Sequence, residues 1–302
     1  MKSFFMLVLL GVLILAGCEQ SNTPDIKLPY SQTPPSNSVS VYRFAVHPLH
    51  NPQKLMEAYQ PLINHINQDL DGVRIELEAS RDYQVYEAKI EQREPAFILP
   101  NPWQTLVAMQ KGYNVIAMAG NADDFKGIFI VRKDANILAP KDLIGKTVAY
   151  PSPTALAAAI MPQYFLYQAG LNINNDVQNS YVGSQESSIM NVYLGSAAAG
   201  ATWPPPWRAF VKDHPQEAAQ LKVIWQTEPL LNNSVMVRED VPLDLAKQVT
   251  KHLLNLHKSD QGQRVLGLME TEQFYAADNA RYDLVRDYIQ RFEQNVRLVR
   301  QP

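Results

Sequence analysis

The chain has 302 residues, of which 46% are hydrophobic and 19% are charged, a composition typical of a globular protein. A single hydrophobic core rarely serves this length, so two lobes are expected. The formal net charge is −3 and no run of basic residues occurs, which argues against nucleic acid or an anionic membrane surface as a partner. An anionic ligand would have to be held by local groups, because the field of the whole protein mildly repels it.

The N-terminus predicts an exported protein. Lys2 precedes an apolar run from Phe4 to Leu15, which has the length of a signal peptide and is too short to span a membrane. Leu15-Ala16-Gly17-Cys18 resembles the lipobox of bacterial lipoproteins, which implies cleavage before Cys18 and acylation of its sulfur. An ordinary secretory signal with an incidental cysteine is the alternative. Cys18 is the only cysteine, so an intramolecular disulfide and a thiolate metal site are excluded.

Residues 1–17 form the expected signal peptide. The chain that follows divides into a tether and a folded body. Residues 18–40 are rich in Pro, Ser, Asn and Gln and predict a flexible tether. Strands and helices then alternate. The pattern predicts strands at 41–46, 73–77, 96–99 and 114–118, and helices at 55–70, at 83–92 and after Pro102. This alternation is typical of an α/β fold with a mainly parallel sheet and helices on both faces.

A second series of alternating elements starts near Phe125. Strands are predicted at 127–131, 146–150, 179–182 and 197–202, with a helix at 154–169 that Gly170 closes and a short helix from Ser187. Strands at 222–225 and 234–237 follow. Beyond them the pattern is purely helical, with one helix at 243–257 and another around 282–292.

These elements and several local motifs resemble the periplasmic substrate-binding subunit of phosphonate and phosphite ABC importers. The resemblance covers nearly all of the folded body. The motifs that carry it are Arg81-Asp82-Tyr83, Asn101-Pro102-Trp103, Asp142 to Val148, Pro162-Gln163-Tyr164 through Ala169-Gly170-Leu171, Gly183-Ser184-Gln185-Glu186-Ser187, and Leu221 to Trp225.

The family implies a type II periplasmic-binding-protein fold, in which two hinge crossovers join two α/β lobes. We expect the crossovers near 124–131 and 228–237. Lobe 1 would comprise 41–125 plus 236–302, and lobe 2 would comprise 126–235. Ligand binds between such lobes, and closure is a hinge motion. Free amide groups and the positive end of the dipole favour an anion where a helix begins.

In lobe 1 the resemblance assigns ligand contacts to Tyr83, Asn101 and Trp103. In lobe 2 it points to the helix start at Thr154, Ala155 and Leu156. Phosphonate binders have a run resembling Ser-Thr-Ser at positions 155–157, whose hydroxyls and amides hold the phosphonate oxygens. Here the amides are kept and the hydroxyls are lost. Thr154 could supply one hydroxyl or cap the helix, and capping is the favoured interpretation.

Of the next two positions, Gln185 departs from the family pattern and Glu186 matches it. Gln185 stands where the family usually has His, so it offers a neutral hydrogen bond and no positive charge. Glu186 is matched and would face a ligand amino group, or it is simply an exposed acid at a helix start.

Trp203 takes the place of a family carboxylate, and it would suit an apolar, aromatic or cationic ligand part. Pro204 to Pro206 would fix where Trp203 and Trp207 point. The alternative is that these Trp side chains only pack in the core or on the prolines. His47 could approach the cleft or be a solvated loop residue. Arg208 could pair with a ligand oxyanion, although a surface role is favoured.

No arrangement typical of an enzyme, a metal site or a cofactor site is present. We therefore predict a lipid-anchored, periplasm-facing, non-enzymatic protein that captures a small phosphonate- or phosphate-like oxyanion for an ABC permease. Presentation of the ligand to a membrane sensor kinase is one alternative. Binding of a non-phosphonate, partly aromatic solute is another.

Overall fold

The computed structural model describes residues 39–299. The expected signal peptide, the tether up to residue 38 and the lipidation site Cys18 lie outside the described residues. In the part of the chain that is described, no helix is both long and apolar enough to cross a membrane.

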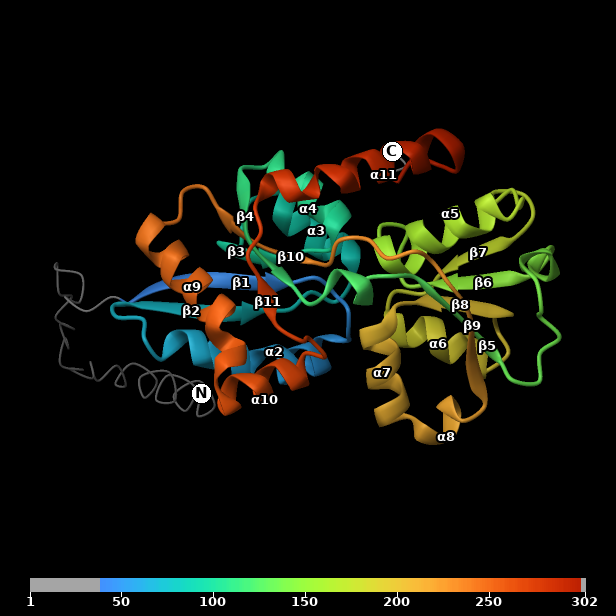
Figure 1. Ribbon diagram of the computed structural model, residues 1–302, viewed down its shortest axis with the longest axis horizontal. Coiled ribbons are helices and arrows are strands. Elements are labelled where there is room, and N and C mark those ends of the chain that lie inside the picture. The colour runs from blue at the N-terminus through green and yellow to red at the C-terminus, as the bar shows by residue number, and fades with distance from the viewer. Residues whose placement is uncertain (1–38, 300–302) are drawn as a thin grey trace, which may run out of the picture. The chain divides into compact units, whose positions relative to one another are not determined.

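The sheet of lobe 1 has six strands in the order β11-β4-β10-β3-β1-β2 (Figure 1). Strand β1 pairs in parallel with β2 and β3, whereas β10 is antiparallel to β3 and β4, and β11 is antiparallel to β4. The bounds are β1 (Ser40–Val46), β2 (Val73–Glu78), β3 (Phe97–Leu99), β4 (Tyr113–Ala119), β10 (Ser234–Arg238) and β11 (Phe274–Tyr275).

The sheet of lobe 2 has five strands in the order β7-β6-β8-β5-β9. Strand β6 is parallel to β7 and β8, whereas β5 is antiparallel to β8 and β9. The bounds are β5 (Ile128–Arg132), β6 (Thr147–Tyr150), β7 (Gln178–Tyr181), β8 (Ala199–Thr202) and β9 (Leu221–Gln226).

The two-lobed α/β architecture is confirmed. Both sheets are mixed: β1 to β4 run in one direction in lobe 1 and β6 to β9 in lobe 2, and the remaining strands run against them. In lobe 2 the antiparallel pairs all involve β5, and in lobe 1 they involve β10 or β11. Strands β5 and β10 enter their sheets directly from the other lobe, without the helical crossover that a parallel connection within one sheet requires, so they can lie antiparallel to their neighbours. Strand β11 also corrects the purely helical C-terminal pattern, because two residues are too few to show alternation.

Helices cover both faces of each sheet. Those next to the lobe 1 sheet are α2 (Pro52–Asn67), α3 (Tyr83–Glu91), α4 (Pro102–Met109), α9 (Leu243–Asn255) and α10 (Asp260–Leu268). Helix α2 shows why they form. Asn51 Oδ1 accepts a hydrogen bond from Lys54 N at 3.0 Å as the N-cap, Pro52 occupies the first turn, and Leu55, Tyr59, Leu62, Ile63 and Ile66 bury one face.

In lobe 2 the predicted helix 154–169 begins two residues later than expected. It consists of a π-helical turn, η3 (Leu156–Ile160), followed by α5 (Met161–Gln168). Lobe 2 also contains α6 (Gln185–Tyr193), α7 (Pro204–Asp213) and α8 (Pro215–Ala218). Helix α7 was not predicted. Its three prolines lie in the first turn, where missing amide donors cost nothing.

Two crossovers join the lobes, one after β4 and one after β9, and they run beside each other. Thr227 N donates to Gly127 O at 2.9 Å, and Gly127 N donates to Thr227 Oγ1 at 2.9 Å. A side chain at Gly127 would place its Cβ 2.6 Å from Ala157 O, so only glycine lets the first crossover approach η3 this closely.

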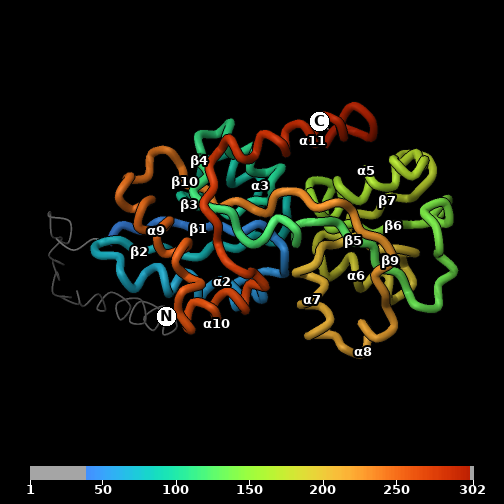
Figure 2. The backbone as a smooth tube through the Cα atoms, in the orientation of Figure 1, coloured from blue at the N-terminus to red at the C-terminus, as the bar shows by residue number. Residues whose placement is uncertain are grey.

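The last helix, α11 (Asp283–Asn295), contacts both lobes (Figure 2). Next to lobe 1 it packs against α4. Further along, the ring of Tyr288 lies 5.4 Å from the ring of Tyr164 in α5, and Tyr167 Oη donates to Asn295 Oδ1 at 3.1 Å. The C-terminal segment, which follows lobe 1 in the chain, is therefore a third physical link between the lobes.

Candidate ligand-binding site between the lobes

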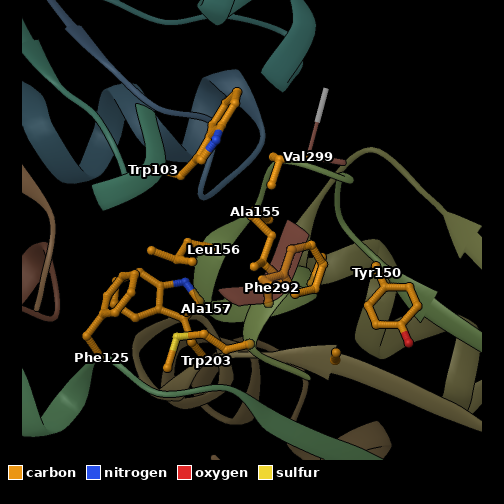
Figure 3. Close-up of a cluster of buried hydrophobic side chains, with 14 of the residues drawn as sticks. Trp103, Phe125, Tyr150, Ala155, Leu156, Ala157, Trp203, Phe292 and Val299 are labelled. Atoms are coloured by element: carbon orange, nitrogen blue, oxygen red, sulfur yellow. The ribbon is translucent and has the colours of Figure 1, made fainter. Parts of the chain in front are cut away.

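The seam between the lobes contains a cluster of buried apolar side chains. Tyr83 and Trp103 of lobe 1 belong to the same cluster of buried side chains as Ala155, Leu156 and Trp203 of lobe 2. Figure 3 shows the last four of these residues. Each of the five is at most 6% exposed. Positions 155–157 are therefore buried against apolar neighbours. This environment suits the apolar side chains that replace the three hydroxyls of the family pattern.

Gln185 joins the lobes by a direct hydrogen bond. It is the first residue of α6, after the N-cap Ser184. Its Nε2 donates to Tyr83 Oη at 3.2 Å, and its Oε1 accepts from Thr202 Oγ1 at 2.8 Å. Burial raises the pKa of Tyr83, so its phenol is neutral. The structure thus brings Tyr83, Ala155 and Gln185 to one seam, as the sequence analysis expected.

Asn101 and Thr154 form a second polar contact across the seam. Asn101 caps α4 through a hydrogen bond from Gln104 N to its Oδ1 at 3.0 Å, and its Nδ2 donates to Thr154 O at 3.1 Å. The Thr154 hydroxyl donates to Glu87 Oε1 at 2.5 Å. The favoured capping role of Thr154 is therefore wrong: Ala155 is the N-cap residue of η3, and no side chain caps that helix.

Glu186 lies apart from this seam. Its carboxylate is 3.3 Å from Nε2 of His214, which lies where α7 meets α8. The first turn of α6 points its second residue away from Gln185, because successive helix residues are about 100° apart. Glu186 therefore pairs within lobe 2.

His47 lies against Tyr83 and was named only as an open alternative. It is 2% exposed, its Nδ1 donates to Leu99 O at 3.1 Å, and its ring centre lies 6.3 Å from that of Tyr83. Burial lowers its pKa to about 4, so the imidazole is neutral at neutral pH. His47 therefore offers an anion no positive charge.

Trp203 faces lobe 1, and Trp207 does not. Trp203 contacts Phe125 of the first crossover at 5.4 Å between ring centres. It also lines a cavity of about 290 Å³ together with Leu49 and Tyr59 of lobe 1. Trp207 stacks on Phe210 of its own helix, with ring centres 6.0 Å apart.

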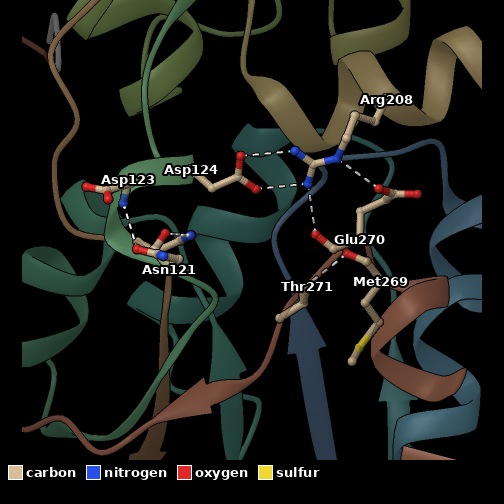
Figure 4. Close-up of polar contacts among 8 residues, drawn as sticks. Asn121, Asp123, Asp124, Arg208, Met269, Glu270 and Thr271 are labelled. Atoms are coloured by element: carbon tan, nitrogen blue, oxygen red, sulfur yellow. Dashed lines mark hydrogen bonds and ion pairs between the residues drawn. The ribbon is translucent and has the colours of Figure 1, made fainter. Parts of the chain in front are cut away.

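Arg208 forms an ionic clamp at one edge of the seam (Figure 4). From α7 it binds both oxygens of Asp124 in the first crossover, at 3.0 and 2.8 Å, and Glu270 Oε2 at 3.0 Å. Nearby, Lys54 of α2 pairs with Asp213 of α7. The favoured surface role of Arg208 was thus incomplete, because the side chain ties lobe 2 to the hinge and to lobe 1.

Replacing Arg208 by glutamine is expected to lower the free energy of unfolding by roughly 1–2 kcal/mol at low salt and by less at high salt. The partners are partly exposed, so each pair is modest and screened. Urea unfolding at two salt concentrations measures this. Arg74→Gln, which removes an exposed pair with Glu76 inside β2, is the matched control. Equal losses for the two variants would show that the clamp adds nothing.

Among residues 39–299, no group of three or more His, Cys, Asp or Glu side chains could hold a metal ion. The arrangement offers instead a seam of opposed loops and helix starts. This arrangement is typical of a class of binding proteins in which two lobes enclose a small molecule at the carboxyl ends of their strands.

Comparison with known proteins identifies the family. The family model for periplasmic substrate-binding proteins of phosphonate ABC transporters matches residues 44–282. The chain belongs to this family, whose members bind substrates for transport and are not enzymes. A probable ABC transporter phosphite-binding protein of Prochlorococcus marinus is 26% identical over 186 residues. That match covers 57% of this chain and 63% of the relative, less than two thirds of its length.

Solved structures agree with the type II fold. A binding-protein component of an ABC phosphonate transporter from Pseudomonas aeruginosa superimposes with a TM-score of 0.79 at 15% identity, covering 85% of this chain and 88% of that one. The Prochlorococcus marinus protein PhnD1, in complex with methylphosphonate, gives a TM-score of 0.76 at 20% identity, covering 85% and 100%.

Proposed function

We propose that this chain is the solute-binding component of an ABC importer and captures a small phosphonate-like oxyanion between its lobes. The observation that carries the proposal is the convergence of Tyr83, Ala155 and Gln185, from three separate elements, on one buried seam. Family membership and the methylphosphonate complex of a similar protein support the choice of ligand class. An ABC permease is the expected partner.

The amide groups at the start of η3 support an anion, because the first N–H groups of a helix lack intrahelical acceptors. Apolar side chains at 155–157 and Trp203 favour a ligand that is partly apolar. A non-phosphonate solute with an aromatic part is therefore the second candidate for the same seam.

A thermal-shift screen distinguishes these ligands. Phosphate, phosphite, methylphosphonate, methanesulfonate, benzoate and the uncharged aromatic benzyl alcohol would be compared at equal ionic strength. A ligand at a hundred times its dissociation constant should stabilise the fold by about 2.7 kcal/mol. No shift with any anion, together with a shift from an uncharged aromatic, would reject the oxyanion.

We also propose that Cys18 carries the lipid that anchors the chain at the periplasmic side of the cell envelope. Labelled palmitate should enter the wild-type chain and not a Cys18→Ser variant, and equal labelling would reject the anchor.

A membrane sensor kinase in place of the permease is the alternative partner. A neighbouring gene pair for a permease and an ATPase would favour the importer.

A further inference from the structure

A groove of about 730 Å³ lies in lobe 1 between helix α9 and the strands β4 and β10. Asn114 and Val237 line it and pair with each other, near the start of β4 and the end of β10. The two crossovers join these strands at their opposite ends. The groove therefore belongs to lobe 1 alone and is separate from the candidate ligand site.

The walls of the groove are largely apolar. One wall is a stripe along α9 whose members recur every three or four residues and so share one face of the helix: Leu243, Ala246, Thr250 and Leu254. The sheet side supplies Ile116, Val237 and Val241. Leu243 is 66% exposed, and Ile116 and Leu254 are only partly covered by the core of lobe 1. A continuous apolar groove of this kind is typical of a binding surface.

Three lysines give the groove a positive rim. Lys247 and Lys251 lie one helical turn apart beside the apolar stripe, and Lys258 follows at the end of η4 (Leu256–Lys258). No ion pair within residues 39–299 involves any of the three. The two other charged lining residues, Arg238 and Glu239, each pair with a neighbour. The free charge of the groove is therefore positive, which favours an anionic group in its occupant.

The length of the apolar stripe fits a single alkyl chain. Leu243 and Leu254 are eleven residues apart, so the stripe extends about 16 Å along the axis of α9. The hydrocarbon layer of one membrane leaflet is about 15 Å thick, half of the bilayer core, and one acyl chain spans it. An acyl chain can therefore lie along the whole stripe, with its head group beside Lys251 and Lys258.

We propose that this groove binds a free, single-chain anionic amphiphile of the fatty-acid class. The alkyl chain lies along α9, and the lysines hold the carboxylate. The negative net charge of the chain repels anions, and this row of lysines supplies the local positive groups that an anion needs. The proposal is independent of the proposed function, because the groove shares no residue with the seam.

Calorimetric titration of the full chain with dodecanoate, hexanoate and dodecyltrimethylammonium, each kept below the concentration at which it forms micelles, tests this. Dodecanoate should bind more tightly than hexanoate, by roughly two- to fourfold for each methylene that the groove buries. Dodecyltrimethylammonium has the same chain with a cationic head and should bind roughly tenfold more weakly. Equal affinity for the two chain lengths, or for the two head groups, would overturn the proposal.

The charge of the rim is tested by the double variant Lys247→Gln with Lys251→Gln. It should weaken dodecanoate binding roughly three- to tenfold at low salt and by less at high salt, because exposed ion pairs are modest and screened. Lys141→Gln with Lys146→Gln, two exposed lysines of lobe 2, is the matched control and should bind dodecanoate like the wild type.

The apolar wall is tested by Leu243→Gln, which removes apolar surface without adding charge. The side chain is mostly exposed, so the fold should be kept, and dodecanoate binding should weaken roughly two- to fivefold. Leu284→Gln, at a 47% exposed position in α11, is the control. Wild-type affinity in both the lysine double variant and Leu243→Gln would overturn the site. A wild-type chain that does not bind dodecanoate would also overturn it, whereas the proposed function would still stand on the binding of methylphosphonate.

Discussion

Replacing Trp203 by alanine is expected to lower the free energy of unfolding by about 3–5 kcal/mol and to open the seam between the lobes. The indole is 6% exposed and packs on Phe125 in the cluster that both lobes share. Its removal leaves a cavity at the interface between the lobes, where separation is the easiest way to relax. Urea unfolding measures the loss, and small-angle X-ray scattering measures the opening.

Trp207→Ala is the matched control, because this indole stacks on Phe210 within lobe 2. It should cost less and leave the radius of gyration unchanged. Equal costs, or an unchanged radius for Trp203→Ala, would contradict the placement of Trp203 as the residue that holds the seam closed.

Acidification from about pH 7 to pH 4 is expected to lower the free energy of unfolding by about 3 kcal/mol through His47 alone. Burial lowers the pKa of His47 from 6.5 to about 4. The unfolded chain therefore binds the proton first, and stability is lost as the pH falls through this window. Burial and the nearby Lys54 also lower the pKa of His50, to about 3, which adds to the loss.

Urea unfolding of the wild type and of His47→Asn at several pH values isolates this effect. The Asn side chain can still donate to Leu99 O but does not titrate. Backbone hydrogen bonds hold the pKa of Asp82 and Asp142 below the usual 3.8, so their contribution is lost at lower pH. The same dependence on pH in both proteins between pH 6.5 and 4 would show that His47 is not responsible.

The local elements were predictable because their signals are local. The apolar face of α2 and the proline at the start of α4 lie within the helices they define. The short helix expected from Ser187 begins at Gln185, after the cap Ser184. The start of η3 was misplaced, because the Thr154 hydroxyl bonds to Glu87, which is 67 residues away in the sequence. Helix α7 was missed for a different reason. Proline usually predicts the end of a helix, and only its placement in the first turn makes the three prolines before Trp207 compatible with one.

The candidate site was predictable only in part. The resemblance to the family identified the loops. In the structure, Tyr83 contacts Gln185 across the seam, and Asn101 contacts Thr154. Arg208 and Arg297 contact residues 84 and 144 positions away. Nothing in their immediate surroundings in the sequence reveals such partners. A single sequence shows which side chains are charged, and long-range folding decides which of them meet.

The two polar edges of the seam have a consequence for the rate of solute uptake. The Arg208 clamp ties one edge of the seam and Arg297 ties the other, so both contacts oppose the parting of the lobes. If the parted form is a minor fraction, the observed dissociation constant is the intrinsic one divided by that fraction, so each 1.4 kcal/mol of closure costs about tenfold in apparent affinity. Opening would then limit capture, and a partner that loosens either edge would speed both loading and release.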